Sequence, residues 1–220
     1  MSDPFPHGAA SGSGIADNAN KENDMGKIVI SENVSLDGVI QDPTGEDGLG
    51  RGSWFSLIGD KDRQAWTTVE FEEAVGAEAM LLGRRSYDWF LARGWASRTG
   101  EWADRLRSLP KYVVSSSALD GPGWSNATTL TGDLLEKVST LKEQLTGDIV
   151  VYGSGRLVHT LMEHDLVDEL RLMTYPVVVG SGERLFGETS GVKPMRLVGN
   201  RTVGDALALL TYQPVRGHRQ

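Results

Sequence analysis

Residues 148–186 read DIVVYGSGRLVHTLMEHDLVDELRLMTYPVVVGSGERLF, a pattern that predicts strand, glycine turn, helix and strand in unbroken order. Residues 149–152 form a short apolar, β-branched run, which is typical of a strand buried on both faces. Gly153, Ser154 and Gly155 follow, and apolar residues then recur at helical spacing. A glycine turn that opens a helix lets an anion approach unpaired backbone amides, but it can also be only a tight turn. This segment alone leaves both interpretations open.

Composition excludes several classes of function. The chain has 220 residues, a formal net charge of −8 and no cysteine. An acidic chain is not expected to bind nucleic acid or an anionic membrane broadly, since both need a basic surface. Without cysteine there is no disulfide, no thiolate nucleophile and no zinc–cysteine site. No apolar run reaches the length of about 18 residues that a membrane-spanning helix needs, and no secretory signal is recognisable. We therefore expect a cytoplasmic protein.

The N-terminal segment differs in composition from the rest. Residues 1–24 are rich in Gly, Ser, Ala, Asn and Asp and have no apolar period, which predicts a disordered leader. We expect one domain over residues 25–216 and a short tail at 217–220.

Strands and helices alternate through most of the chain. The patterns predict further strands at 27–34, 79–82, 111–114, 127–130 and 168–179, helices at 60–74, 87–92 and 134–145, and a closing hairpin of strands at 195–203 and 206–212. This order predicts an α/β fold with a mainly parallel sheet and an antiparallel edge hairpin. The loop at 41–53 is long enough to be a lid over a site, although a plain surface connection has the same length.

Three predicted strands end in groups that suit phosphate. Gly83 to Ser86 places two arginines and a hydroxyl between a strand and a helix, Ser115 and Ser116 follow the next strand, and the glycine turn at 153–155 follows a third. In an open parallel sheet, ligands bind beyond the carboxyl ends of the strands. If these strands are parallel neighbours, the three groups share one edge, which favours an extended phosphate ligand such as a dinucleotide.

Competing sites fit less well. A Rossmann G-x-G-x-x-G would need glycine where Val158 stands, and a nucleophile elbow would need glycines two residues on either side of Ser154. His159 and His164 are five residues apart, so they do not stack on one helix face as a metal pair would. We therefore expect no protein metal site.

Several motifs, taken in order, resemble the dihydrofolate reductase-like superfamily. They are SENVSLDGVI, LLGRRSYDWF, VVSSS, and VYGSGRLVHTL followed by LVDELRLMTYPVVVGSGERLF. The chain is most similar to the branch that contains the C-terminal reductase domain of the riboflavin-biosynthesis deaminase-reductase. The resemblance implies a three-layer α/β/α fold around a mostly parallel eight-stranded sheet, an NADPH cofactor, a small-molecule substrate and a homodimer.

The resemblance also implies roles by position. The residues that it assigns to the cofactor are Val39, Ile40, Gly83, Arg84, Arg85, Ser86, Ser115, Ser116, Tyr152, Gly153, Ser154, Gly155, Arg156, Leu157 and Val158. Thr174 matches a strand threonine on the substrate side. Folate reductases place a buried carboxylate on their first helix, and Trp54 followed by Asp60 is a loose parallel, so no catalytic acid is assigned. Folate reductases hold the peptide that corresponds to Gly153–Ser154 cis, and we expect the same here.

These implications predict an NADPH-dependent reductase that transfers hydride to a small heterocyclic, pterin- or pyrimidine-like, or carbonyl substrate. One alternative is the 5-amino-6-(5-phosphoribosylamino)uracil reductase step of riboflavin biosynthesis. The other is a nucleotide-binding module that has this fold but no turnover.

Overall fold

The computed structural model describes residues 25–119, 121 and 123–216, so the predicted leader and tail lie outside the described residues. The elements in chain order are β1 (Lys27–Ser35), η1 (Trp54–Leu57), α2 (Asp60–Gly76), β2 (Ala77–Gly83), α3 (Arg84–Ala92), α4 (Glu101–Ser108), β3 (Lys111–Val114), β4 (Ala127–Leu130), α5 (Leu134–Gln144), β5 (Asp148–Tyr152), α6 (Gly155–Glu163), β6 (Glu169–Tyr175), β7 (Met195–Val203) and β8 (Leu207–Pro214).

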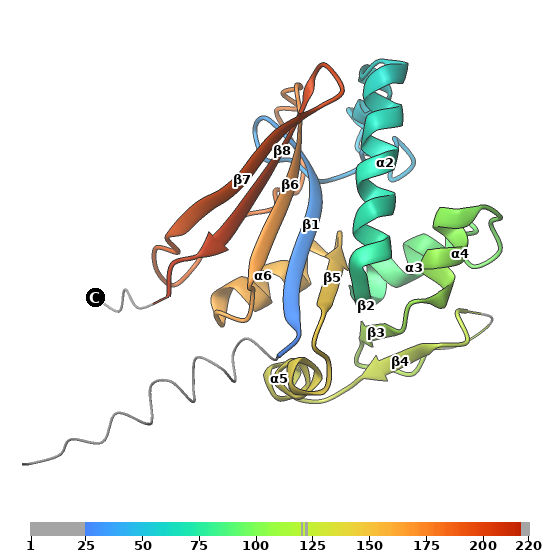
Figure 1. The fold of residues 1–220 in the computed structure, drawn as a ribbon, viewed down its shortest axis with the longest axis vertical. Coiled ribbons are helices and arrows are strands. Elements are labelled where there is room, and N and C mark those ends of the chain that lie inside the picture. Colours follow the sequence, from blue (N-terminus) through green and yellow to red (C-terminus); the bar gives the residue numbers. More distant parts are fainter. Residues whose placement is uncertain (1–24, 120, 122, 217–220) are drawn as a thin grey trace, which may run out of the picture.

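One eight-stranded sheet organises the molecule, in the order β4-β3-β2-β5-β1-β6-β8-β7 (Figure 1). The strands from β4 to β6 pair in parallel, whereas β8 pairs antiparallel with both β6 and β7. The prediction of a mainly parallel sheet with an antiparallel C-terminal hairpin is therefore confirmed.

Helices cover both faces of this sheet and make the three layers (Figure 1). Side chains alternate along a strand, so Ile28 and Ile30 of β1 pack on one face and Val29 on the other. The first face packs against α5 and α6, and the second packs against α2, α3 and α4. None of the helices in the described part of the chain is both long and apolar enough to cross a bilayer.

One local prediction was wrong, and one helix was missed. The sixth strand was expected to run through Pro176 to residue 179, but β6 ends at Tyr175, because proline has no N–H to donate to a neighbouring strand. Helix α4 was not predicted at all. Its buried residues are Ala103 and Leu106 only, so the apolar spacing is too sparse to mark an eight-residue helix.

Of the two edge strands of the sheet, β7 is irregular and β4 is short. At one edge, β7 has a register shift between Leu197 and Gly199, and Leu197 and Val198 are exposed there. Arg196 and Arg201 flank this irregularity. At the other edge, β4 has four residues.

A buried lysine joins α4 to the sheet. Lys111 at the start of β3 is fully buried, and its Nζ donates to the carbonyl oxygens of Leu106, Arg107 and Leu109 at the end of α4 and to Asn126 Oδ1. The ammonium also lies 4.6 Å from the centre of the Trp124 ring. Burial lowers the pKa of Lys111 to about 7. The side chain therefore satisfies carbonyls that a helix end otherwise leaves unpaired.

We expect Lys111→Met to reduce the free energy of unfolding by about 2 kcal/mol or more, because buried carbonyls lose their donor. Urea denaturation measures this loss. Lys137→Met, at an exposed position of α5, is the matched control and should change stability little. Equal stability of the two variants would contradict a capping role for Lys111.

Candidate active site

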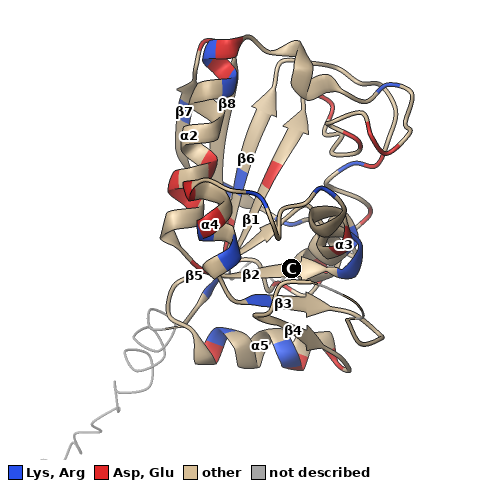
Figure 2. Cartoon of the chain, turned by 90° about the vertical axis from the view of Figure 1, so that its right-hand side faces the viewer, with Lys and Arg blue, Asp and Glu red and all other residues tan. Residues whose placement is uncertain are grey.

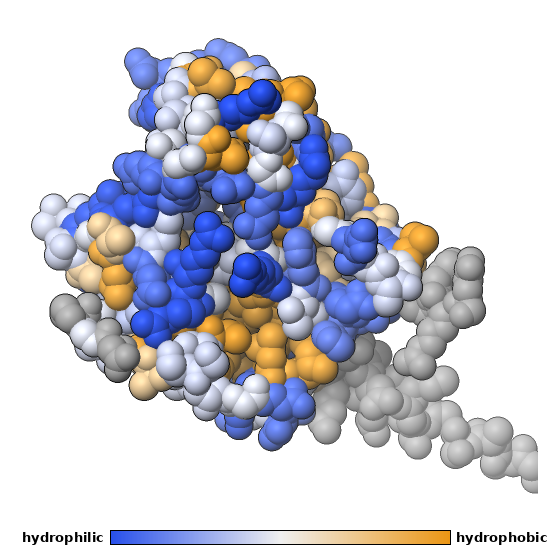
Figure 3. Space-filling view, turned by 180° about the vertical axis from the view of Figure 1, so that it is seen from behind, coloured by the Kyte–Doolittle hydropathy of each residue, from blue (hydrophilic) through white to orange (hydrophobic). Residues whose placement is uncertain are grey.

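A cavity of about 870 Å³ opens at the carboxyl edge of the parallel strands. Strands β3, β2 and β5 are parallel neighbours, so the turns that follow them meet at this edge. Basic residues of α3 gather there (Figure 2). Seen from behind the view of Figure 1, the surface has a hollow near its middle that hydrophilic residues border, and apolar residues are exposed below it (Figure 3). The predicted sharing of one edge by three strand ends is therefore present.

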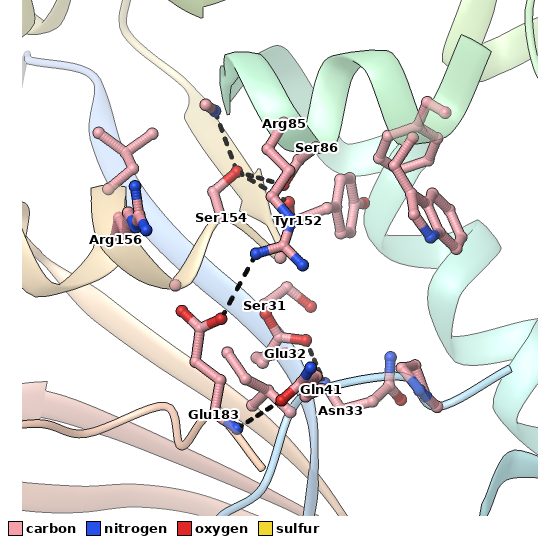
Figure 4. A pocket seen from close by; sticks show the side chains of 18 of the residues that line it. Ser31, Glu32, Asn33, Gln41, Arg85, Ser86, Tyr152, Ser154, Arg156 and Glu183 are labelled. Carbon is pink, nitrogen blue, oxygen red and sulfur yellow. Dashed lines mark hydrogen bonds and ion pairs between the residues drawn. The ribbon is translucent and has the colours of Figure 1, made fainter. Parts of the chain in front are cut away.

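The Ser154 hydroxyl ties two of these turns together. Its Oγ accepts from the Gly83 backbone N–H at 2.9 Å and donates to Ser86 Oγ at 2.8 Å (Figure 4). Gly153 and Ser154 both have positive φ, 62° and 66°, which turns the chain from β5 into α6. No described peptide bond is cis, so the predicted cis bond between them was wrong. Two successive left-handed residues make the turn instead.

Three arginines line the mouth of the cavity, namely Arg84, Arg85 and Arg156. Arg84 points along α3, with its Nε 2.9 Å from Asp88 Oδ2 and its Nη1 donating to the Ala118 carbonyl. It also borders an adjoining cavity, which is lined in addition by Ser115, Ser116 and Gly132. Arg84 thus connects the two hollows, and the second phosphate-compatible group lies in the smaller one.

The loop 41–53, called the covering loop below, forms part of the cavity lining. This favours a lid over a plain surface connection. Gln41, Asp42, Thr44 and Asp47 contribute to the lining. Asp42 is buried, and its carboxylate accepts from the backbone N–H groups of Asp47 and Leu49 at 2.8 and 2.9 Å. Arg93 pairs with Glu46 and Asp47. These contacts hold the loop in place over the cavity.

Aromatic rings wall the inner part of the cavity. The rings that line it are Phe55, Trp66, Trp89, Phe90, Trp95, Trp102 and Tyr152. Trp102 contacts Trp66 and Trp95 with ring centroids 5.7 and 5.1 Å apart. Such a wall favours a flat, unsaturated ring as ligand.

Two carboxyl groups line the cavity, those of the buried Glu70 and the half-buried Glu32, and neither was assigned from the sequence. Glu70 of α2 is buried, and burial raises its pKa well above the usual range, with Glu73 and Glu32 adding repulsion. Burial also raises the pKa of Glu32, on β1, to about 8. Glu32 Oε1 accepts from the Asn33 backbone N–H, while Oε2 has no hydrogen-bond partner among the described residues. Glu32, with a pKa of about 8, is therefore mostly protonated at neutral pH and can donate a proton, and the raised pKa of Glu70 favours its protonated form.

Glu70, and not Asp60, is the acidic residue of α2 that lines the cavity. Asp60 is exposed in the first turn of α2 and lies outside the residues that line the cavity. Glu70 follows Trp66 by four residues and precedes Ala74 by four, so it shares the inward stripe of the helix. Trp66 Nε1 donates to Asn33 Oδ1 at 2.8 Å beside it. The helical spacing of the sequence contained this signal.

Glu73 lies behind the cavity in an ion-pair network. Arg171 of β6 is 3.3 Å from Glu73, 2.7 Å from Asp148 and 2.7 Å from Glu169. Burial nevertheless raises the pKa of Glu73. The pKa of Tyr152, which lies between this network and the cavity, is also raised well above its usual range by burial and by the nearby Glu73 and Glu70.

Several residues that the resemblance assigned lie away from the cavity. Val39 and Val158 are fully buried core residues, whereas their neighbours Ile40 and Leu157 line the cavity. Trp54 is buried, and its Nε1 donates to the Gln41 carbonyl, so it supports the covering loop from behind.

Thr174 also lies outside the lining of the cavity, so its predicted place beside the substrate is not found. Met173 and Tyr175 pack in the core on the α2 face, and Leu172 packs on the opposite face. Because side chains alternate along β6, Thr174 shares the face of Leu172.

Comparisons with known proteins agree with this architecture. A putative riboflavin biosynthesis protein from Shewanella sp. PV-4 superposes with a TM-score of 0.68 at 20% identity, over 86% of this chain and 99% of that one. Dihydrofolate reductase from Enterococcus faecalis, in complex with NADP(H), superposes with a TM-score of 0.54 at 14% identity, over 86% and 96%. The fold is thus that of the dihydrofolate reductase-like reductases, as the resemblance implied.

The family model of the RibD C-terminal domain matches residues 26–209, and this chain belongs to that family. The uncharacterized protein YyaP of Bacillus subtilis (strain 168) is 30% identical over 190 residues, which span 84% of this chain and 94% of that protein.

The raised pKa of Glu32 predicts a pH-dependent stability. Between the ordinary carboxyl pKa of 4.5 and about 8, the folded state retains a proton that the unfolded state has lost. Stability from this group is therefore fully present below pH 4.5 and is lost as the pH rises to 8. The free energy of unfolding should fall by up to about 1.4 kcal/mol per pH unit more steeply than in Glu32→Gln. Urea denaturation at pH 5 to 8 measures both slopes, and parallel slopes would refute the assignment.

Proposed function

We propose that this protein is an NADPH-dependent reductase that transfers hydride to a flat, pterin- or pyrimidine-like ring without a phosphate group. One observation supports this most directly: a single cavity joins a rim of arginines and glycine turns to an aromatic-walled interior that contains a buried carboxyl group whose pKa is raised by burial. A phosphate-bearing cofactor suits the rim, and an unsaturated ring suits the interior.

The residues at the rim fit a dinucleotide. Gly153 has a φ of 62°, a conformation that residues with a side chain rarely adopt, so glycine suits this turn. Arg84 with Ser115 and Ser116 suits a 2′-phosphate, and the start of α6 suits a diphosphate. NADPH, when bound, supplies the hydride.

Within the interior, Glu70 is the group that we assign as proton donor. Burial raises its pKa well above the usual range, which favours the protonated form, and it lines the same cavity as the aromatic walls. Trp66 and Asn33 lie beside it and fix its surroundings. A ring nitrogen or carbonyl that receives the proton as hydride arrives would lie against these walls.

A second candidate, the 5-amino-6-(5-phosphoribosylamino)uracil reductase step, is supported by family membership. Its substrate carries a phosphate in addition to those of the cofactor. Among the described residues, the cationic side chains that line the main cavity are Arg84, Arg85 and Arg156, and all three lie at the rim assigned to the cofactor. This distribution favours a substrate without phosphate. Complementation of a strain that lacks the riboflavin step distinguishes the two.

We expect Arg84→Ala to weaken NADPH binding tenfold or more and NADH binding much less, because the guanidinium would pair with the 2′-phosphate. Calorimetric titration measures both affinities. Arg196→Ala, on the distant β7, is the control and should bind both cofactors as the wild type does. Equal losses for the two cofactors would reject the 2′-phosphate assignment, and no binding of NADPH at millimolar concentration would reject the proposed cofactor.

Glu70→Gln should lower kcat at least 100-fold while NADPH affinity stays within about threefold, because the amide cannot release a proton. The assay is NADPH oxidation with a panel of pterins, pyrimidines and quinones. Glu72→Gln, at an exposed position of the same helix, should retain wild-type turnover. Unchanged turnover in Glu70→Gln would remove it from the mechanism, and cofactor binding with no turnover in the wild type would favour a non-catalytic nucleotide-binding module.

A further inference from the structure

The loop that follows β6 carries an acidic side chain to the mouth of the cavity. Its backbone is fixed at Glu183 by two hydrogen bonds to the segment after β1. The Ile40 N–H donates to the Glu183 carbonyl at 3.0 Å, and the Glu183 N–H donates to Gln41 Oε1 at 2.9 Å. The loop therefore holds Glu183 beside the covering loop 41–53.

The Glu183 carboxylate lies over the start of α6. Its Oε1 is 2.8 Å from the position that a Cβ on Gly155, the first residue of α6, would take. Its Oε2 is 3.7 Å from Arg85 Nη1. Figure 4 shows the carboxylate between Arg85 and the glycine turn. The carboxylate thus lies beside the first residue of α6 and within ion-pair distance of Arg85, where a helix start and a cation both favour an anion.

A second carboxyl group faces the same place from below. Glu32 lies under the glycine turn, and its Oε2 is 4.0 Å from the position that a Cβ on Gly153 would take. Repulsion by Glu183 adds to the rise in the pKa of Glu32 that burial causes. An incoming diphosphate would bring two more negative charges to this point. The carboxylate of Glu183 and the ligand would repel each other beside Arg85, so they compete for that arginine.

We propose that Glu183 is a built-in competitor that occupies the anion position at the start of α6 and leaves Arg85 when a diphosphate binds. It thereby weakens the binding of the cofactor and speeds its release. The inference rests on the proposed function, because NADPH is the ligand whose diphosphate would displace it. An exposed ion pair with no such role would be nearly neutral for stability and for binding.

The test compares the wild type with Glu183→Gln, which preserves the shape of the side chain and removes its charge. Two probes are used, NADPH and inorganic pyrophosphate, because pyrophosphate tests the anion position without the rest of a cofactor. Calorimetry gives the affinities, and amide NMR shifts of Gly155 and Arg156 report where each probe binds. Glu188→Gln, an exposed glutamate five residues along the chain, is the control. Glu183→Ala removes the carboxylate without leaving an amide and serves as a second variant.

We expect both Glu183 variants to bind pyrophosphate and NADPH at least fivefold more tightly than the wild type at low salt. The gain should shrink as ionic strength rises, and Glu188→Gln should match the wild type. Pyrophosphate affinity that is unchanged or weaker in both variants would overturn the inference, even if NADPH binds well. Tighter pyrophosphate binding without any NADPH binding would uphold the competition between Glu183 and a diphosphate but reject NADPH as the ligand concerned.

Discussion

Parallel pairing of β2, β5 and β1 is the constraint on which the rest of this structure depends. In a parallel sheet each strand ends at the same edge, so the turns into α3 and α6 must meet there. The Ser154 hydroxyl then bonds one turn to the other. The covering loop, the arginines of the rim and the buried carboxyl groups all take their positions from that edge.

The two ends of the cavity favour ligand groups of different charge. Near the mouth, arginines and helix starts favour anions. Further in, burial raises the pKa of both Glu32 and Glu70 and so disfavours negative charge in the interior. A ligand with a charged tail and a neutral ring meets a matching environment at each end. Arg171 binds Asp148, Glu169 and Glu73 behind the interior and so offsets part of the negative charge there.

Much of the fold followed from the sequence, because short β-branched runs, glycine turns and the closing hairpin are local signals. The rim was predictable for the same reason, since Gly83 to Ser86 and the turn at 153–155 lie directly after strands. The residues of the inner cavity were harder to predict from the sequence. Whether Glu32 is buried depends on which strands flank β1, and pairing partners are not visible in one strand's sequence. The inward position of Glu70 could have been predicted from its spacing of four residues from Trp66. The backbone geometry of Gly153–Ser154 could not be predicted, because two residues of positive φ and a cis peptide bond can each turn the chain from a strand into a helix at the same position.

The irregular β7 edge bears on how copies of this chain can meet. A sheet edge offers a row of unpaired backbone groups that a second molecule can extend. Here the register shift at Leu197 and Gly199 breaks that row, and Arg196 and Arg201 place like charges along it. The four residues of β4 give the opposite edge too little length to template a partner. A homodimer, which the family resemblance implies, is therefore better served by side-chain surfaces than by a sheet continued across two molecules, and the same features oppose growth into fibres.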